Sequence, residues 1–219
     1  MTSNTPPLRD DYRSVHAKRF ELSLEWLRPH IGCKDVLELG GASPFTAMLS
    51  GNQVGIVKQD LREPLRMAGD FWDVVLCMEV IEHIADKDGL HTEWTGDGVN
   101  TMLREAFRVL RPGGVLFLTT PNAASITAIH HALRLAPPMI YRPHVREYAP
   151  YELDEIVRAA GFAIERRETL DVWRNAISPE HHRRITEFIA VSGFYPRELR
   201  GEDIFLLARK PILETPKEC

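Results

Sequence analysis

Short apolar runs alternate with amphipathic segments along most of this chain, and this alternation constrains its fold more than any other feature. The clearest run is 73–78 (Asp-Val-Val-Leu-Cys-Met), and similar runs occupy 35–40, 53–59 and 115–120. A strand that is apolar at almost every position is typical of a parallel sheet covered on both faces. Strands that alternate with helices predict an α/β fold with a mostly parallel sheet and right-handed crossovers.

The remaining segments fill in this pattern. Helices are predicted at 12–27, 45–49, 100–110, 123–135, 151–160 and 179–191, and two late strands at 162–169 and 204–210. A length of 219 residues suits one domain. We therefore expect a disordered lead over 1–10 and a single domain over 11–219.

Composition excludes several classes of protein. Hydrophobic residues make up 44% and charged residues 26%, which is ordinary for a globular domain. A net charge of −4 argues against a long nucleic acid, DNA included, as a partner. No apolar segment is long enough to span a membrane, and no secretory signal is recognised, so no membrane partner is expected. Three cysteines without CxxC spacing favour a reducing, cytoplasmic location.

In sheets of this kind, ligands bind beyond the carboxyl ends of the strands. The small residues Gly40, Gly41 and Ala42 follow Glu38 there, and they permit a sharp turn and close approach of the backbone to a bound group. The dinucleotide pattern GxGxxG is not met. Asp60 comes 22 positions after Glu38 and can accept hydrogen bonds from ribose hydroxyls. The alternatives are a tight loop without a ligand and a solvated aspartate.

Two longer segments carry a family resemblance. Phe71–Ile84 (FWDVVLCMEVIEHI) and Val109–Asn122 (VLRPGGVLFLTTPN), together with the motifs above, resemble class I S-adenosylmethionine-dependent methyltransferases. The subgroup with Glu-x-x-Glu-His after the fourth strand is the most similar, and the resemblance covers roughly 35–162. It implies a Rossmann-like methyltransferase fold with an antiparallel last strand. It also implies S-adenosylmethionine as the cofactor and S-adenosylhomocysteine as the product.

The resemblance assigns cofactor-binding roles to residues at strand ends and in the first helix. They are Glu38, Gly40, Gly41, Ala42, Asp60, Leu61, Cys77, Met78, Glu79 and Tyr12. The first four match the loop that cradles the methionine part of the cofactor, and Asp60 matches the acid that binds the ribose. Tyr12 is expected to fold over the cofactor.

The chain also departs from the family pattern. Ala42 and Pro44 stand where the usual first motif has glycines. Only 13 positions separate Asp60 from Asp73, where a complete member has a helix, another strand and a polar residue that contacts the adenine. We therefore expect a fold shortened between the second and fourth strands, with Asp60 alternatively in the role of that polar residue. Segments 86–99 and 123–150 are expected to form a lid and bind substrate.

Glu79, Glu82 and His83 raise the question of a metal. On a helix these side chains share one face, and their oxygen and nitrogen atoms suit Mg²⁺ or Mn²⁺. Relatives such as terminal-ribose RNA methyltransferases and ubiquinone-pathway O-methyltransferases use this motif with metal. The RNA type needs a further histidine, for which His144 and His131 are candidates. The alternative, which we favour, is that Glu82 and His83 orient the loop without a metal.

Methyl transfer to oxygen requires aligned reactants and, often, a general base. His144 and His83 are the leading candidates for that base because histidine titrates near neutrality, and Glu79 is the third. The pairs His130–His131 and His181–His182 are expected on helix surfaces. His91 and Trp94 are equally explained by substrate contact or by a solvated loop.

These observations predict a cytoplasmic, monomeric or homodimeric methyltransferase. Its expected substrate is a small-molecule hydroxyl, such as that of a sugar, a glycan precursor or a natural product. One alternative is a metal-dependent RNA 2′-O-methyltransferase, which a pI near 6.1 disfavours. The other is a cofactor-binding or regulatory subunit that has lost turnover.

Overall fold

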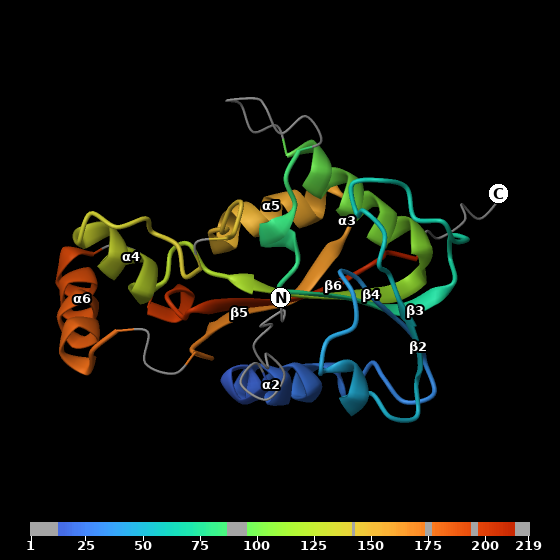
Figure 1. Ribbon diagram of the computed structural model, residues 1–219, viewed down its shortest axis with the longest axis horizontal. Helices are drawn as coiled ribbons and strands as arrows, with labels where there is room; N and C mark the ends of the chain where they lie inside the picture. Colours follow the sequence, from blue (N-terminus) through green and yellow to red (C-terminus); the bar gives the residue numbers. More distant parts are fainter. Residues whose placement is uncertain (1–12, 87–95, 142, 174–176, 194–196, 213–219) are drawn as a thin grey trace, which may run out of the picture.

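The computed structural model describes residues 13–86, 96–141, 143–173, 177–193 and 197–212, and its centre is one six-stranded sheet (Figure 1). The strands are β1 (Asp35–Glu38), β2 (Gln53–Ile56), β3 (Trp72–Met78), β4 (Leu110–Pro121), β5 (Ala163–Leu170) and β6 (Asp203–Arg209). Their order is β2-β1-β3-β4-β6-β5. The first four are parallel, and β6 runs antiparallel to both β4 and β5. The prediction of a mostly parallel sheet with an antiparallel ending is confirmed.

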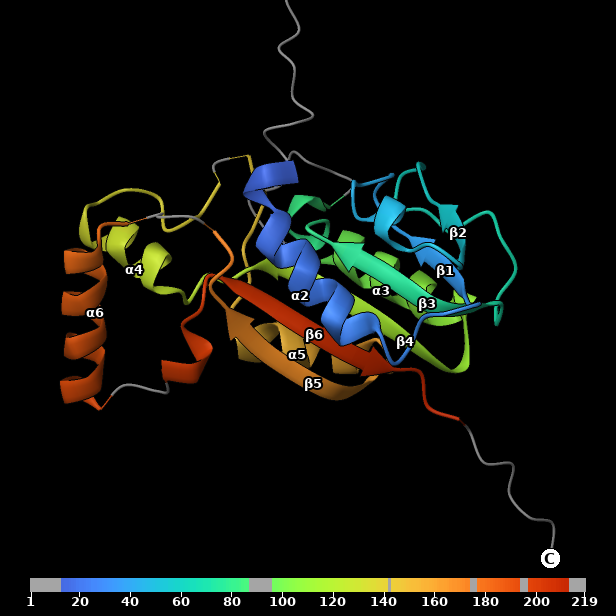
Figure 2. The same cartoon turned by 90° about the horizontal axis from the view of Figure 1, so that it is seen from below.

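Helices cover both faces of the sheet, with α2 on one face and α3 and α5 on the other (Figures 1 and 2). The helices are α2 (Ala17–Leu27), α3 (Asp97–Val109), α4 (Ile126–Leu133), α5 (Pro150–Ala159) and α6 (Pro179–Ser192). Single 3₁₀ turns are η1 (Thr46–Met48), η2 (Ile81–His83) and η3 (Arg197–Leu199). Among the residues described, no helix is both long and apolar enough to cross a bilayer.

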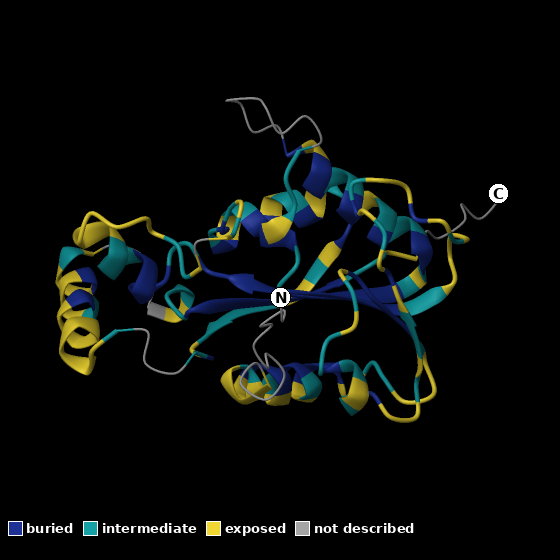
Figure 3. Ribbon diagram, in the orientation of Figure 1, coloured by how far each residue is buried: buried dark blue, intermediate teal, exposed yellow. Residues whose placement is uncertain are grey.

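The two faces of the sheet bury separate cores. Val75 and Cys77 point toward α3 and α5, whereas Val74 and Leu76 point toward α2. Successive side chains of a strand point to opposite faces, so a strand covered on both sides must be apolar throughout. Figure 3 shows the result, with the central strands buried and the outer faces of the helices exposed. The apolar runs in the sequence therefore mark the centre of the sheet.

The chain is shortened between β2 and β3, as predicted. Residues 57–71 contain no helix or strand and run directly from one to the other. Leu61 and Leu65 anchor this segment in the core beneath α3. Arg108 of α3 donates to the carbonyls of Leu65 and Met67, at 3.0 Å each, and so fixes its path. As a result β2 is an edge strand of the sheet.

Two local predictions were wrong. The predicted helix over 45–49 is the single turn η1 in the structure. The chain reverses after Leu49, where the Asn52 side chain donates to the Leu49 carbonyl and accepts the Gly32 amide. The predicted strand 53–59 ends at Ile56 in the structure. The Val57 amide still donates to the Glu38 carbonyl of β1, and beyond it the chain leaves β1 and turns toward the core.

Helices α4 and α6 pack against each other beyond one end of the sheet (Figures 1 and 2). Ile126, Ile185 and Ile189 form the small apolar cluster between them. His130 on α4 lies 3.1 Å from His181 on α6, ring nitrogen to ring nitrogen, at an exposed contact between the two helices.

Candidate active site

An open cleft of about 580 Å³ lies at the carboxyl ends of β1, β2 and β3. Its walls come from the segments that follow these three strands. The lining residues are Gly40, Val57, Lys58, Gln59, Asp60, Leu61, Arg62, Glu79, Val80, His83, Ile84 and Ala85. This is the position at which α/β sheets bind ligands.

The loop after β1 owes its shape to glycine and to one buried carboxylate. Gly40 and Gly41 have φ angles of +86° and +108°, a region that other residues rarely adopt. A Cβ on Gly40 would lie 2.7 Å from a methyl carbon of Val80, whereas one on Gly41 would meet no atom within 4 Å. The Glu38 carboxylate is buried and accepts hydrogen bonds from the Ser43 amide and the Thr46 hydroxyl. Glu38 therefore holds the loop in place, and Gly40 lets it press against Val80.

Asp60 lies in the cleft, and its carboxylate is already engaged. Arg62 donates to it through Nε at 3.0 Å and through Nη2 at 2.8 Å. This hydrogen bond raises the pKa of the Arg62 guanidinium. The same guanidinium reaches the carbonyl of Asp86 at 3.3 Å. A ligand that uses Asp60 must share it with Arg62, a residue that sequence reasoning did not single out.

Glu79 leaves the end of β3 in an unusual conformation. Its φ of +56° is uncommon for a residue other than glycine. This turn brings its carboxylate within 3.1 Å of the Arg19 guanidinium and 2.9 Å of the Thr119 hydroxyl. Arg19 is 1% exposed and comes from α2. The sequence carried a signal for it, because Arg19 shares the helix face of the buried residues Ser23 and Trp26.

Glu82 is buried on the opposite face of the sheet from α2. One carboxylate oxygen, Oε2, accepts a hydrogen bond of 3.0 Å from Thr120, and the other, Oε1, has no hydrogen-bond partner within the described ranges. Burial and the charge of Glu79 hold the pKa of Glu82 well above its usual range. The Glu82 carbonyl accepts the amides of Val145 and Arg146, which ties the two segments together.

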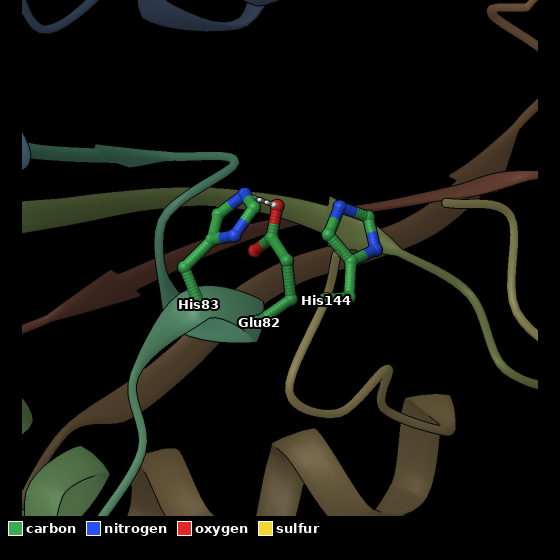
Figure 4. A group of neighbouring side chains, drawn as sticks. All are labelled: Glu82, His83 and His144. Carbon is green, nitrogen blue, oxygen red and sulfur yellow. Dashed lines mark ion pairs between the residues drawn. The ribbon is translucent and has the colours of Figure 1, made fainter. Parts of the chain in front are cut away.

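The free Glu82 oxygen lies between two imidazoles (Figure 4). His83 Nε2 is 3.9 Å away, and one ligand atom each from Glu82, His83 and His144 fall within 4.8 Å of one another. The His83 and His144 rings meet edge to face at 4.8 Å. Burial and the neighbouring His144 lower the pKa of His83. The structure thus unites the two leading candidate bases with a buried carboxyl group.

Comparison with known proteins identifies the fold and the family. A family model described as a methyltransferase domain matches residues 21–166. The chain belongs to this methyltransferase family. A solved S-adenosylmethionine-dependent methyltransferase from Archaeoglobus fulgidus superposes with a TM-score of 0.58 and 20% identity, over 92% of this chain and all of that one. This methyltransferase domain thus has the fold predicted from its sequence.

Two curated relatives match part of the domain. A probable S-adenosylmethionine-dependent methyltransferase of Mycolicibacterium smegmatis is 36% identical over 104 residues, which is 48% of this chain and 33% of that protein. A ubiquinone biosynthesis O-methyltransferase of Azorhizobium caulinodans is 32% identical over 111 residues, again 48% of this chain and 39% of that protein. The matched stretch thus spans well under half the length of either relative.

The predicted cofactor residues of this methyltransferase domain differ in where they lie relative to the cleft. Gly40, Asp60, Leu61 and Glu79 line the cleft. Gly41 and Ala42 continue the loop beside it, and Glu38 supports that loop from below. The Cys77 and Met78 side chains pack into the two cores, so only their backbone is available to the cleft. Tyr12, His91 and Trp94 lie outside the described residues.

The cleft suits the methyltransferase cofactor, S-adenosylmethionine. Gly41 leaves space next to its backbone, and the Asp60 carboxylate is 44% exposed, so both can contact a ligand. A metal in the predicted set of Glu79, Glu82 and His83 fits less well, because Glu79 faces Arg19 instead. One carboxylate and two imidazoles do remain together at Glu82, His83 and His144, a donor set that divalent ions accept. His131 is not part of this group, and its Nδ1 lies 2.9 Å from the Met139 carbonyl oxygen.

Asp203 is a buried acid that sequence reasoning missed. Neither carboxylate oxygen has a hydrogen-bond partner in the part of the chain that the structure describes. Burial and the charge of Glu79 raise the pKa of Asp203 well above its usual range. Asp203, Glu79 and Glu82 thus form a group of neighbouring carboxyl groups at the end of the sheet. The guanidinium of Arg19 is buried and interacts with all three.

Proposed function

We propose that this chain is an S-adenosylmethionine-dependent methyltransferase of the Glu-x-x-Glu-His subgroup that methylates a hydroxyl group of a small molecule. One observation carries the proposal. The His144 side chain is buried next to the cleft wall formed by His83, and its Nδ1 lies 2.7 Å from the Glu147 carboxylate. An imidazole held in this way has its second nitrogen available to accept a proton from a hydroxyl group.

The residues divide the work as follows. When bound, S-adenosylmethionine supplies an electrophilic methyl group on a sulfonium. The Gly40 loop and Asp60 hold that cofactor in the cleft. His144 accepts the proton of the acceptor hydroxyl, and the buried Glu82 and the exposed His83 shape the wall beside it. The name of the Azorhizobium relative, an O-methyltransferase, supports oxygen as the acceptor atom. Sugars, glycan precursors and natural products are the acceptor classes we propose. The cytoplasmic location and the monomeric or homodimeric state stay predictions.

The first test is calorimetric titration with S-adenosylmethionine and S-adenosylhomocysteine. Asp60→Asn is expected to weaken binding about 10-fold or more, as for loss of a hydrogen bond to a charged group. Glu63→Gln is the matched control, because Glu63 is an exposed acid of the same segment that does not line the cleft. No binding by the wild-type protein would overturn the proposal. Binding without turnover on any acceptor would favour the regulatory subunit instead.

The second test concerns the acceptor. Small molecules that carry hydroxyl groups are compared with matched amines as acceptors, and transfer to oxygen is expected. His144→Ala should lower the turnover number about 100-fold or more, the usual contribution of a general base, with cofactor affinity unchanged. Methylation of amines alone, or full activity of His144→Ala, would contradict the assignment of His144.

A second candidate is divalent-ion-dependent transfer at the same site. It is favoured by the buried Glu82 Oε1, which has no hydrogen-bond partner among the described residues and lies between His83 and His144. An ion there would assist deprotonation of a hydroxyl, as in an RNA 2′-O-methyltransferase. Dialysis against a chelator followed by Mg²⁺ or Mn²⁺ addition distinguishes the two. Activity that is lost and then restored favours the ion, and activity that survives excludes it.

A further inference from the structure

Glu147 is a buried carboxylate, and His144 is the imidazole it contacts within the described ranges. Its side chain is 1% exposed, and that of His144 is 6% exposed. The Glu147 oxygen Oε1 accepts the backbone amides of Ile140 at 2.7 Å and Tyr141 at 3.2 Å, in addition to its 2.7 Å contact with His144 Nδ1. A carboxylate oxygen that already accepts two amide hydrogens is an acceptor, so the third group that contacts it must donate a hydrogen. His144 Nδ1 therefore carries a hydrogen, and in a neutral imidazole the other nitrogen, Nε2, is then the acceptor.

The backbone that follows His144 has anchors other than the Glu147 carboxylate. The amides of Val145 and Arg146 donate to the Glu82 carbonyl at 2.8 and 3.2 Å. Tyr148 forms a bridge with Asn122 at the end of β4. These contacts place the His144 ring next to Glu82 whichever way its nitrogens point.

Packing alone does not select the orientation of the ring. His83 and Tyr141 meet the His144 ring edge to face, at centroid distances of 4.8 and 5.2 Å. Such contacts do not distinguish a ring nitrogen from a ring carbon. The hydrogen bond to Glu147 does, because only Nδ1 can donate to it.

We propose that Glu147 is a positioning residue, which fixes His144 in the Nδ1–H tautomer and leaves Nε2 free on the side of Glu82 (Figure 4). This inference rests on the proposed function, in which His144 accepts the proton of the acceptor hydroxyl. Glu147 itself does not touch the reacting atoms. It acts through the tautomer and the orientation of His144.

The first measurement needs no substrate. Two-bond ¹H–¹⁵N correlation spectra of chelator-treated protein report which nitrogen of His144 carries the hydrogen. We expect the Nδ1–H form in the wild type, its retention in Glu147→Gln, whose amide oxygen can still accept, and a mixture of tautomers in Glu147→Ala. Glu152→Gln is the matched control, because Glu152 bonds the Ala149 amide and Arg146 in the same segment but does not touch His144. An Nε2–H form in the wild type would overturn the inference.

The second measurement is a double-mutant cycle on the methyl-transfer rate. Glu147→Ala alone should lower the turnover number about 100-fold, while KM changes less than about threefold and Glu147→Gln recovers most of the loss. In a His144→Ala background the same substitution should have no further effect. Losses that multiply would show a merely structural role for Glu147. If His144→Ala remains fully active while Glu147 still controls the tautomer, the proposed base fails and the positioning assignment stands.

Discussion

The buried pair of Arg19 and Glu79 offers the most direct test of how this site is held together. Arg19 Nη1 lies 3.1 Å from Glu79 Oε1, and both side chains are almost completely removed from water. Arg19→Met keeps an unbranched apolar stem and removes the guanidinium with its charge. Glu79 would then face Glu82 and Asp203 without the cation that now balances it.

The loss can be bounded from two sides. Two unit charges at 3.1 Å attract by about 5 kcal/mol at an effective dielectric constant of about 20. Removing one partner of a buried pair costs about 3–5 kcal/mol in practice. A glutamate left without its partner can instead take up a proton, at a cost that grows by about 1.4 kcal/mol per pH unit. We therefore expect Arg19→Met to lower the free energy of unfolding by about 3–4 kcal/mol at pH 7 and by about 1 kcal/mol at pH 5.

Urea unfolding followed by circular dichroism at several pH values measures this difference. Arg28→Met, at the exposed end of the same helix, controls for loss of a helical arginine. The double variant Arg19→Met/Glu79→Gln should regain at least about half of the lost stability, since no charge is left unpaired. A loss below about 1 kcal/mol at pH 7, or one that does not depend on pH, would refute the reasoning.

Three further predictions follow from the geometry. Gly40→Ala should weaken S-adenosylmethionine binding at least about 10-fold in calorimetry, since the added Cβ would clash with Val80. Gly51→Ala is the control, because Gly51 has a similar φ but open space beside it. It should lose only about 1 kcal/mol of stability. The raised pKa values of Glu82 and Asp203 mean that the folded state binds more protons than the unfolded state above about pH 4. This contribution to stability is present at low pH and is lost as pH rises, by up to about 1.4 kcal/mol per pH unit for each group. Glu82→Gln and Asp203→Asn should therefore make the slope of the unfolding free energy against pH less negative. Identical slopes in the variants and the wild type would contradict this. Burial also raises the pKa of the Cys77 thiol, so a thiol reagent should label it only when the protein unfolds, and labelling of the native state would argue against the packing described.

The sheet could be predicted from sequence because its signal is local. The residues at 74–78 and 115–118 of the central strands are all buried, so these runs are apolar without interruption. The single turn η1 could not be predicted in the same way. Its apolar residues Phe45 and Leu49 satisfy helical spacing, but the chain reverses at Asn52 before a second turn can form. The local apolar pattern predicts which side chains of a segment are buried. The length of the helix or strand depends on contacts with other segments, which the pattern does not contain.

Some residues of the candidate site could be predicted from the sequence, and others could not. Gly40, Asp60 and Glu79 lie in the segments that follow β1, β2 and β3, so the topology places them together at one edge of the sheet. Arg19 and Glu147 could not be found in that way. Each acts through a partner that no sequence spacing specifies, Arg19 across 60 positions and Glu147 through a turn that brings it back onto His144.

The missing helix and strand change what the cleft must do. In this chain one segment, 57–62, supplies the whole wall between β2 and β3. Asp60 is the acidic side chain of that wall, whereas the family pattern provides one polar residue for the ribose and another for the adenine. Arg62 already donates to both oxygens of the Asp60 carboxylate, which leaves fewer acceptor positions there for a ligand. We therefore expect recognition of the adenosyl part to depend more on the backbone of this segment and on apolar contact with Leu61 than on paired acidic side chains.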